Sequence, residues 1–290
     1  MIITEENYFS PEVQRKYMDV SMFKEMFGTP AREGCEARAM AKLNGEFAEE
    51  KGEALLFGSL VDVMLTGTKE ELLKFMSDNH NMYASKGPTK GQLKVAYQKA
   101  YQMVDRARQD EKFMKYLDGE HQKIMTGNIF GLDWRIKIDC YIPGKAIVDL
   151  KTCESIQKMY WSGSDRTHYN FIEYFDYIFQ GAIYQEIVYQ NTGKKLPFYL
   201  ACISKEKATD IELIYIDNKT LHERIHGNEF MDGIADKVET ARLLINKELN
   251  PRECGKCEYC LQKKVIKKPV WYQHIGYGEG DEGEIQNNNF

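Results

Sequence analysis

Residues 146–153 read AIVDLKTC and follow the turn segment YIPGK at 141–145. The run is apolar enough for a buried strand, yet Asp149 and Lys151 stand two residues apart within it. Because side chains alternate along a strand, the apolar residues share one face while Asp149 and Lys151 share the other. An ordinary core strand does not place an acid and a base side by side, so this face is either solvated or a site.

The segment before the turn, RIKIDCY, predicts a partner strand for this run. A hairpin centred near Gly144 places Asp139 opposite Asp149, with Cβ atoms about 4.5–5.5 Å apart. Two carboxylates at that distance repel unless a cation lies between them or one is protonated. A bound Mg²⁺ or Mn²⁺ ion, which takes oxygen ligands, explains how the two carboxylates can face each other. The alternative is a solvated face whose acids form cross-strand ion pairs with Lys137 and Lys151.

Further polar residues interrupt apolar segments. Asp62 lies in a helix expected over 53–66, on the face of Leu55, Gly58 and Ser59, where it is either a ligand or an exposed edge. Glu120 opens the first strand of the meander and is a candidate for the same cleft. In a later helix, Gln180 and Tyr184 are four residues apart and share a face, which reflects either packing or function.

Composition limits the function classes. The 290 residues are 43% hydrophobic and 29% charged, which is typical of a soluble globular protein. The net charge of −5 excludes a uniformly basic nucleic-acid coat, so any DNA contact must be local. Candidates are Lys137 and Lys151, whereas Lys86, Lys90 and Lys94 also fit a solvated helix face.

The N-terminus shows no secretory signal, and no apolar run approaches the roughly 20 residues that cross a bilayer. An odd count of seven cysteines argues against an extracellular disulfide framework. We therefore expect a cytoplasmic protein without membrane contact.

Periodicity predicts helices, a central three-stranded meander, a helix and more strands, which makes a mixed α/β layer. We expect one domain over 1–270 and an acidic flexible tail over 271–290. The helices are expected at 10–28, 33–44, 53–66, 89–117, 170–191 and about 218–248, and the strands within 121–152, 197–204 and 210–217.

An acid on a helix, an acid on a strand, a turn, Asp-x-Lys and a Q-x-x-x-Y helix together resemble the PD-(D/E)XK nuclease superfamily. Within it the chain resembles the RecB-like exonucleases, and most of all the phage and prophage RecE-like group. The similar blocks span 35–260 and read CEARAMAKLNGEF, LLFGSLVDVMLTG, IVDLKT, FQGAIYQEIVYQNTGKKLPFY and CGKCEYC. This resemblance implies a restriction-endonuclease-like core, with a mixed central β-sheet flanked by helices.

The resemblance also implies the site chemistry. Asp139 and Asp149 would bind the catalytic Mg²⁺ or Mn²⁺. Asp62 would be the helix-borne ligand, where many RecB-like enzymes have histidine. Glu120 resembles the early-strand acid of the superfamily, and Lys151 would stabilise charge and orient the attacking water.

The remaining implied residues contact DNA. Gln180 and Tyr184 would position the DNA backbone near the metal, and Lys137 is a further candidate contact. The resemblance implies a 5′-to-3′ exonuclease on linear duplex DNA in phage-type recombination or replication. It also implies a single-strand annealing protein as partner and allows a homo-oligomer. The alternatives are a non-catalytic DNA- or protein-binding module and an endonuclease or CRISPR-adaptation-like nuclease.

A cysteine cluster lies near the C-terminus. Cys254, Cys257 and Cys260 supply three soft ligands, one short of the four that zinc or a cubane iron–sulfur cluster takes. Iron–sulfur RecB-like nucleases join an N-terminal cysteine to such a triplet, so the resemblance implies a [4Fe–4S] cluster with Cys35. Zinc, with His274 as a candidate ligand, and free cysteines are the alternatives.

The other cysteines fall in strand contexts, which predicts small core residues. They are Cys140, Cys153 and Cys202.

Overall fold

The computed structural model describes residues 1–49, 52–229, 231–266, 269 and 271–272. Its centre is a mixed five-stranded sheet in the order β1-β2-β3-β6-β7. Within this sheet β3 and β6 pair in parallel, whereas β1–β2, β2–β3 and β6–β7 pair antiparallel. The strands are β1 Glu120–Ile129, β2 Leu132–Ile142, β3 Ala146–Cys153, β6 Phe198–Ser204 and β7 Ile211–Ile216.

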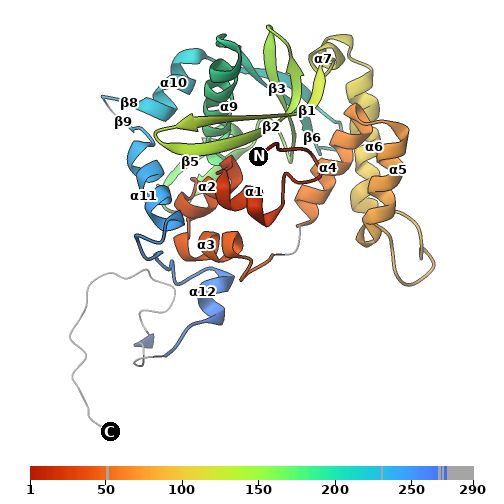
Figure 1. Ribbon diagram of the computed structural model, residues 1–290. Coiled ribbons are helices and arrows are strands. Elements are labelled where there is room, and N and C mark those ends of the chain that lie inside the picture. Colours follow the sequence, from red (N-terminus) through yellow and green to blue (C-terminus); the bar gives the residue numbers. More distant parts are fainter. Residues whose placement is uncertain (50–51, 230, 267–268, 270, 273–290) are drawn as a thin grey trace.

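Helices cover both faces of this sheet, and each face has its own apolar cluster. One cluster joins the sheet to α2 Val20–Phe27, α3 Glu36–Asn44, α9 Tyr177–Thr192, α10 Asn218–His226 and α11 Ala235–Ile245. The other cluster joins the sheet to α4 Glu53–Thr66, α6 Val95–Arg108 and α7 Glu111–Tyr116. Figure 1 shows α4 and α6 (orange to yellow) beside α5 Lys69–Asp78 on one side of the molecule. The expected α/β class is confirmed.

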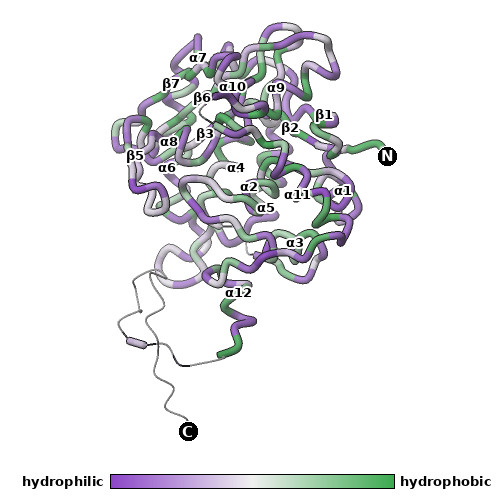
Figure 2. Tube along the Cα trace, turned by 90° about the vertical axis from the view of Figure 1, so that its left-hand side faces the viewer, coloured by the Kyte–Doolittle hydropathy of each residue, from purple (hydrophilic) through white to green (hydrophobic). Residues whose placement is uncertain are grey.

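A helix from the first fifth of the chain contacts the last described helix. The short helix α12 Glu258–Gln262 packs against α3, although more than two hundred residues separate them. Figures 1 and 2 agree on this placement, since α12 lies directly below α3 in both views.

The predicted helix over 53–66 and the meander are observed, but several long helices are divided. The stretch 10–28 forms α1 Pro11–Lys16 and α2, because Met18 pairs its backbone with β2 and Asp19 caps α2. Likewise, Asp110 starts α7 within the expected helix 89–117, and the Asp176 cap separates α8 Phe171–Tyr174 from α9.

The expected helix over about 218–248 ends early. Gly227 closes α10 with φ 79°, and the short strands β8 Gly227–Asn228 and β9 Met231–Asp232 precede α11. A second two-stranded ribbon, missed from the sequence, is formed by β4 Met159–Ser162 and β5 Thr167–Asn170.

The predicted core cysteines are confirmed, since Cys140, Cys153 and Cys202 are buried. Among the described helices, none is long and apolar enough to cross a membrane. The expected tail falls almost wholly outside the described residues, as does His274.

Candidate active site

A cavity of about 710 Å³ lies between α4, the end of β3 and the wall made by β4 and α8. The α4 face expected from the sequence lines it, namely Leu55, Gly58, Ser59 and Asp62. From the sheet come Asp139 and Lys151. Three of the polar residues predicted for one site therefore share one cavity.

The sheet is distorted at Asp139, which lines the cavity. Trp134 and Ile138 pack in the α9-side cluster, whereas Cys140 packs in the opposite cluster, so the alternation of side chains changes phase at Asp139. The pairing of β1 with β2 skips Gln122, which lies opposite Asp139. Gln122 has a left-handed φ of 51°. Irregularities of this kind re-aim a side chain next to a functional site.

The β2–β3 hairpin has the predicted register but is shorter than expected. Pairing runs from Ile142–Ala146 to Cys140–Val148, as a hairpin centred on Gly144 requires. It ends one pair before Asp139 and Asp149. Instead, Asp139 Oδ2 accepts a 2.9 Å hydrogen bond from the Leu150 backbone N–H, which fixes the carboxylate at the point where the strands part.

Asp149 is the buried member of the site, with 1% of its surface exposed. Its Oδ1 accepts a 2.5 Å hydrogen bond from Gln180 Nε2 on α9. Its Oδ2 lies 2.6 Å from Lys151 Nζ but accepts no well-oriented hydrogen bond from the described residues. One oxygen of a buried carboxylate is thus held by charge alone and keeps its capacity to accept a ligand.

The pKa values reflect this crowding of charge. Burial, followed by the Asp149 and Asp62 carboxylates, raises the pKa of Asp139 well above its usual range. Burial also raises the pKa of Asp62 against the opposing effects of Thr66 and Lys137. Burial alone lowers the pKa of Lys151, but the Asp149 carboxylate outweighs it and the net pKa is raised, so Lys151 is a cation.

Two cavity neighbours were missed by sequence reasoning. Gln122 Nε2 donates a 2.9 Å hydrogen bond to Asp62 Oδ2, and His121 Nδ1 lies 3.2 Å from the Asp139 backbone oxygen. His121 is also one of the charges that lower the pKa of Asp62. The only signal in the sequence is a polar run, EHQK, where an apolar strand was expected.

Other predicted residues lie beside the cavity rather than in its lining. Tyr184 donates a 3.1 Å hydrogen bond to the Lys137 backbone oxygen, so it supports β2 next to Asp139. The ammonium of Lys137 lies over the Tyr8 ring at 5.8 Å. Glu120 pairs with Lys123 at 2.7 Å and is half-exposed, so the structure does not bring it to the cavity.

The lysines considered for a helix face lie elsewhere. Lys86, Lys90 and Lys94 are exposed and precede α6 instead of lying within it. None of them lines the cavity described above. Their placement favours solvation over DNA contact.

The acidic residues fit a hard divalent cation. Asp62 and Asp139 line the cavity, and each has a pKa raised by burial and by neighbouring carboxylate charge. A cation bound by these carboxylates would offset the charge that raises their pKa values, and Asp149 Oδ2 accepts no well-oriented hydrogen bond from the described residues. The donor set therefore suits the Mg²⁺ or Mn²⁺ expected from the sequence.

Away from this cavity, the four cysteines expected to act together converge. The Sγ atoms of Cys35, Cys254, Cys257 and Cys260 all lie within 4.8 Å of one another. The individual Sγ distances are 3.6 Å for Cys35–Cys260, 3.7 Å for Cys35–Cys257 and 3.9 Å for Cys254–Cys260. Backbone N–H groups of Arg38 and Cys257 donate to the sulfurs of Cys35 and Cys254.

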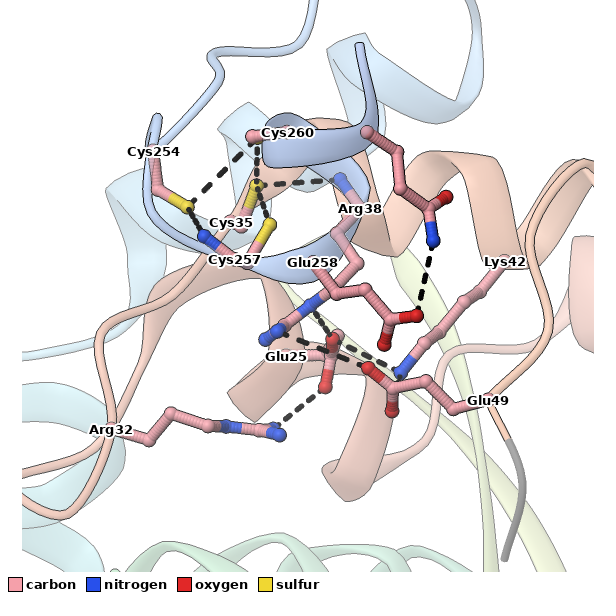
Figure 3. Close-up of polar contacts among 11 residues, drawn as sticks. Glu25, Arg32, Cys35, Arg38, Lys42, Glu49, Cys254, Cys257, Glu258 and Cys260 are labelled. Carbon is pink, nitrogen blue, oxygen red and sulfur yellow. Dashed lines mark hydrogen bonds and ion pairs between the residues drawn. The ribbon is translucent and has the colours of Figure 1, made fainter. Parts of the chain in front are cut away.

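A network of ion pairs supports the cysteine site (Figure 3). Arg38 pairs with the buried Glu25, which also binds Arg32 at 2.6 Å and Lys42 at 3.1 Å. The Cys257 thiol is one of the groups that raise the pKa of Arg38, so this cation lies within electrostatic reach of the sulfurs. The Arg38 guanidinium would offset part of the negative charge that thiolates bring.

A second clamp ties the same two chain segments together. Glu36, which follows Cys35, binds the Arg252 guanidinium at 2.5 and 2.9 Å, and the Arg252 backbone N–H at 2.9 Å. The Ala37 N–H in turn donates to the Arg252 backbone oxygen at 3.0 Å. The cysteines are therefore held in place by contacts that do not depend on a bound metal.

Comparison with known proteins decides the family. Residues 19–263 match the model of a family described as a PDDEXK-like domain of unknown function (DUF3799). The chain belongs to this family. The matched residues include the cavity acids, Lys151 and all four cysteines.

One solved structure shares the overall fold of this chain. The chain is 40% identical to a protein from Eubacterium rectale described as a "putative exonuclease", with a TM-score of 0.87, and the likeness covers 96% of this chain and 99% of that one. A second structure, SSO0001, is 13% identical over 82% of this chain and 98% of that one, with a TM-score of 0.31. Among curated proteins, no match is found.

Proposed function

We propose that this PDDEXK-like protein is a divalent-metal-dependent deoxyribonuclease that hydrolyses phosphodiester bonds from the ends of linear duplex DNA. The observation that carries the proposal is the cavity where Asp62, Asp139 and Lys151 meet beside the buried Asp149. The similarity to the Eubacterium rectale protein supports exonuclease over endonuclease action.

Asp62, Asp139 and Asp149 would hold Mg²⁺ or Mn²⁺, which when bound polarises the scissile phosphate and lowers the pKa of bound water. Gln180 orients Asp149 through its short hydrogen bond, and Tyr184 orients the strand that carries Asp139. Lys151 faces the cavity as a cation and stabilises the negative charge that develops on the phosphate oxygens. We leave Glu120 outside this ligand set, because its carboxylate pairs with Lys123.

The biological setting follows from the resemblance to RecE-like nucleases. Digestion in the 5′-to-3′ direction would leave a single strand for an annealing protein during phage-type recombination. Strand polarity is tested with duplexes labelled at the 5′ or the 3′ end.

The test of the nuclease itself is digestion of an end-labelled linear duplex with Mg²⁺ or Mn²⁺. We expect the wild-type protein to shorten it, and Asp149→Asn to remove the activity. Asp105→Asn, an exposed α6 acid, is the matched control and should cut as the wild type does. An inactive wild type would support the competing hypothesis of a non-catalytic binding module, and cleavage of covalently closed circles would indicate an endonuclease.

We also propose that the four cysteines bind one zinc ion instead of the [4Fe–4S] cluster that the resemblance implied. Tetrahedral zinc with Zn–S bonds of about 2.3 Å separates its sulfurs by about 3.8 Å, close to the distances between these Sγ atoms. A cubane cluster attaches its four cysteines to four different iron atoms, which requires a wider opening.

A further inference from the structure

The β4–β5 ribbon forms part of the cavity wall and has two different faces. Tyr160 lines the cavity and stacks on Tyr174 of α8, with ring centroids 4.9 Å apart and planes at 18°. Because side chains alternate along a strand, the next residue, Trp161, points to the opposite face. One face of the ribbon therefore belongs to the catalytic cavity and the other is turned to solvent.

The outer face carries an unusual residue for an exposed position. Trp161 is 54% exposed, although folding favours burial of so large an apolar side chain. It lies directly across the ribbon from His168, with ring centroids 5.0 Å apart. The two rings form an aromatic surface beside the cavity.

The ribbon is held in a defined shape. Ser162 is buried, and its hydroxyl contacts Ser164 at 3.0 Å and the Asp165 carboxylate at 3.2 Å. The turn continues through Arg166, whose φ of 53° is left-handed, and α8 packs against both strands. These contacts give the ribbon a defined conformation that leaves Trp161 exposed.

The charges around the aromatic surface suit nucleic acid. Arg166 and His168 are exposed, and neither takes part in an ion pair with another described residue. Nearby Lys158 is balanced by Glu154 at 2.5 Å, and Asp165 accepts from the Tyr169 hydroxyl. An aromatic face with an unpaired guanidinium beside it is a combination that binds an unpaired base and its phosphate.

We propose that the β4–β5 ribbon separates the two strands at a duplex end. One strand enters the cavity along the Tyr160 face, and the first unpaired base of the other strand stacks on Trp161, with its phosphates near Arg166 and His168. This proposal rests on the proposed nuclease function and names the structural part that prepares its substrate. Because the ribbon lies between them, the displaced DNA strand stays away from Asp62, Asp139 and Asp149.

The test compares a blunt duplex with the same duplex carrying non-complementary, already unpaired ends. Trp161→Ala should slow digestion of the blunt duplex by about tenfold, the range of one lost base–aromatic stack, and should slow digestion of the frayed duplex much less. Trp161→Phe, which keeps an aromatic ring, should retain most of the blunt-end rate. Tyr215→Ala removes a similarly exposed ring, at 51%, from the edge strand β7 and should leave the blunt-to-frayed ratio unchanged.

Equal slowing on both substrates, or no slowing on either, overturns the proposal. If the wild-type protein digests neither DNA, the proposed function fails by itself. The ribbon is then judged by fluorescence anisotropy with the same labelled duplexes: selective loss of blunt-end binding in Trp161→Ala supports it, and unchanged binding overturns it. Melting temperatures of all variants confirm that they fold.

Discussion

Gln180 Nε2 lies 2.5 Å from Asp149 Oδ1, so a side chain of α9 fixes the buried acid of β3 from the face opposite α4. The amide donates to one oxygen and leaves the other beside Lys151. This contact links the Q-x-x-x-Y helix to the D-x-K strand in physical terms.

Gln180→Ala should therefore reduce the rate of DNA cleavage by about 10- to 100-fold and raise the Mg²⁺ concentration needed for half-maximal rate, because groups that orient metal ligands have effects of this size. Titration of the cleavage rate with Mg²⁺ measures both. Gln190→Ala, on the same helix but bonded to Asn128, is the control. A rate loss without a change in metal dependence would contradict the orienting role.

Asp139→Asn should stabilise the protein when no divalent ion is added. The pKa of the Asp139 carboxyl is raised in the folded protein relative to the unfolded chain. Its contribution to the free energy of unfolding is therefore full below the pKa of the unfolded chain, about 3.9, and is lost as the pH rises through the pKa of the folded protein. At neutral pH the amide avoids that loss and still accepts the Leu150 N–H bond. We expect a melting temperature a few degrees above wild type at pH 7 and a smaller difference near pH 4. An unchanged difference across this range would show that charge is not the cause.

Lys151→Met should lower the cleavage rate by about 100- to 1,000-fold, as removal of one stabilising donor does elsewhere, while the protein still binds DNA. The Lys151 ammonium should also stay charged at alkaline pH, because Asp149 raises its net pKa. The wild-type rate should therefore show no alkaline decline from this group below about pH 10, its ordinary pKa being about 10.4. Single-turnover cleavage across pH, together with an affinity measurement, separates the two effects.

The cysteine site should yield one zinc per chain by elemental analysis, and a colourless protein. Cys257→Ser should lose most of the zinc and lower the melting temperature, because the tie between α3 and the C-terminal segment weakens. Cys153→Ala, outside the cluster, should keep its zinc. A brown protein that contains iron and sulfide would overturn the assignment.

Much of the candidate site was predictable from local rules. The spacing of Leu55, Gly58 and Asp62 defines a helix face whatever the helix packs against, and the Pro-Gly turn sets the β2–β3 register. These rules place the acids and Lys151 near one another. The family resemblance supplied their order along the chain.

What escaped prediction depends on tertiary contacts. The change of phase at Asp139 accompanies the left-handed Gln122 on another strand, and nothing in either residue type requires it. The divided helices were partly readable, since Asp19 and Asp110 are good N-caps, but apolar periodicity continued through them. The β4–β5 strands are four residues each, too short for a pattern of period two to stand out.

The contact between Cys35 and Cys260 constrains the order in which the cysteine site can form during synthesis. Cys35 and Cys260 are 225 residues apart in sequence, yet their sulfurs lie 3.6 Å from each other. At about 5–20 residues per second, a ribosome needs roughly 10–45 s to deliver the second cysteine after the first. During that interval Cys35 and Glu36 have no partners, so the cysteine site cannot form until the segment that carries Arg252 and Cys260 has been synthesised.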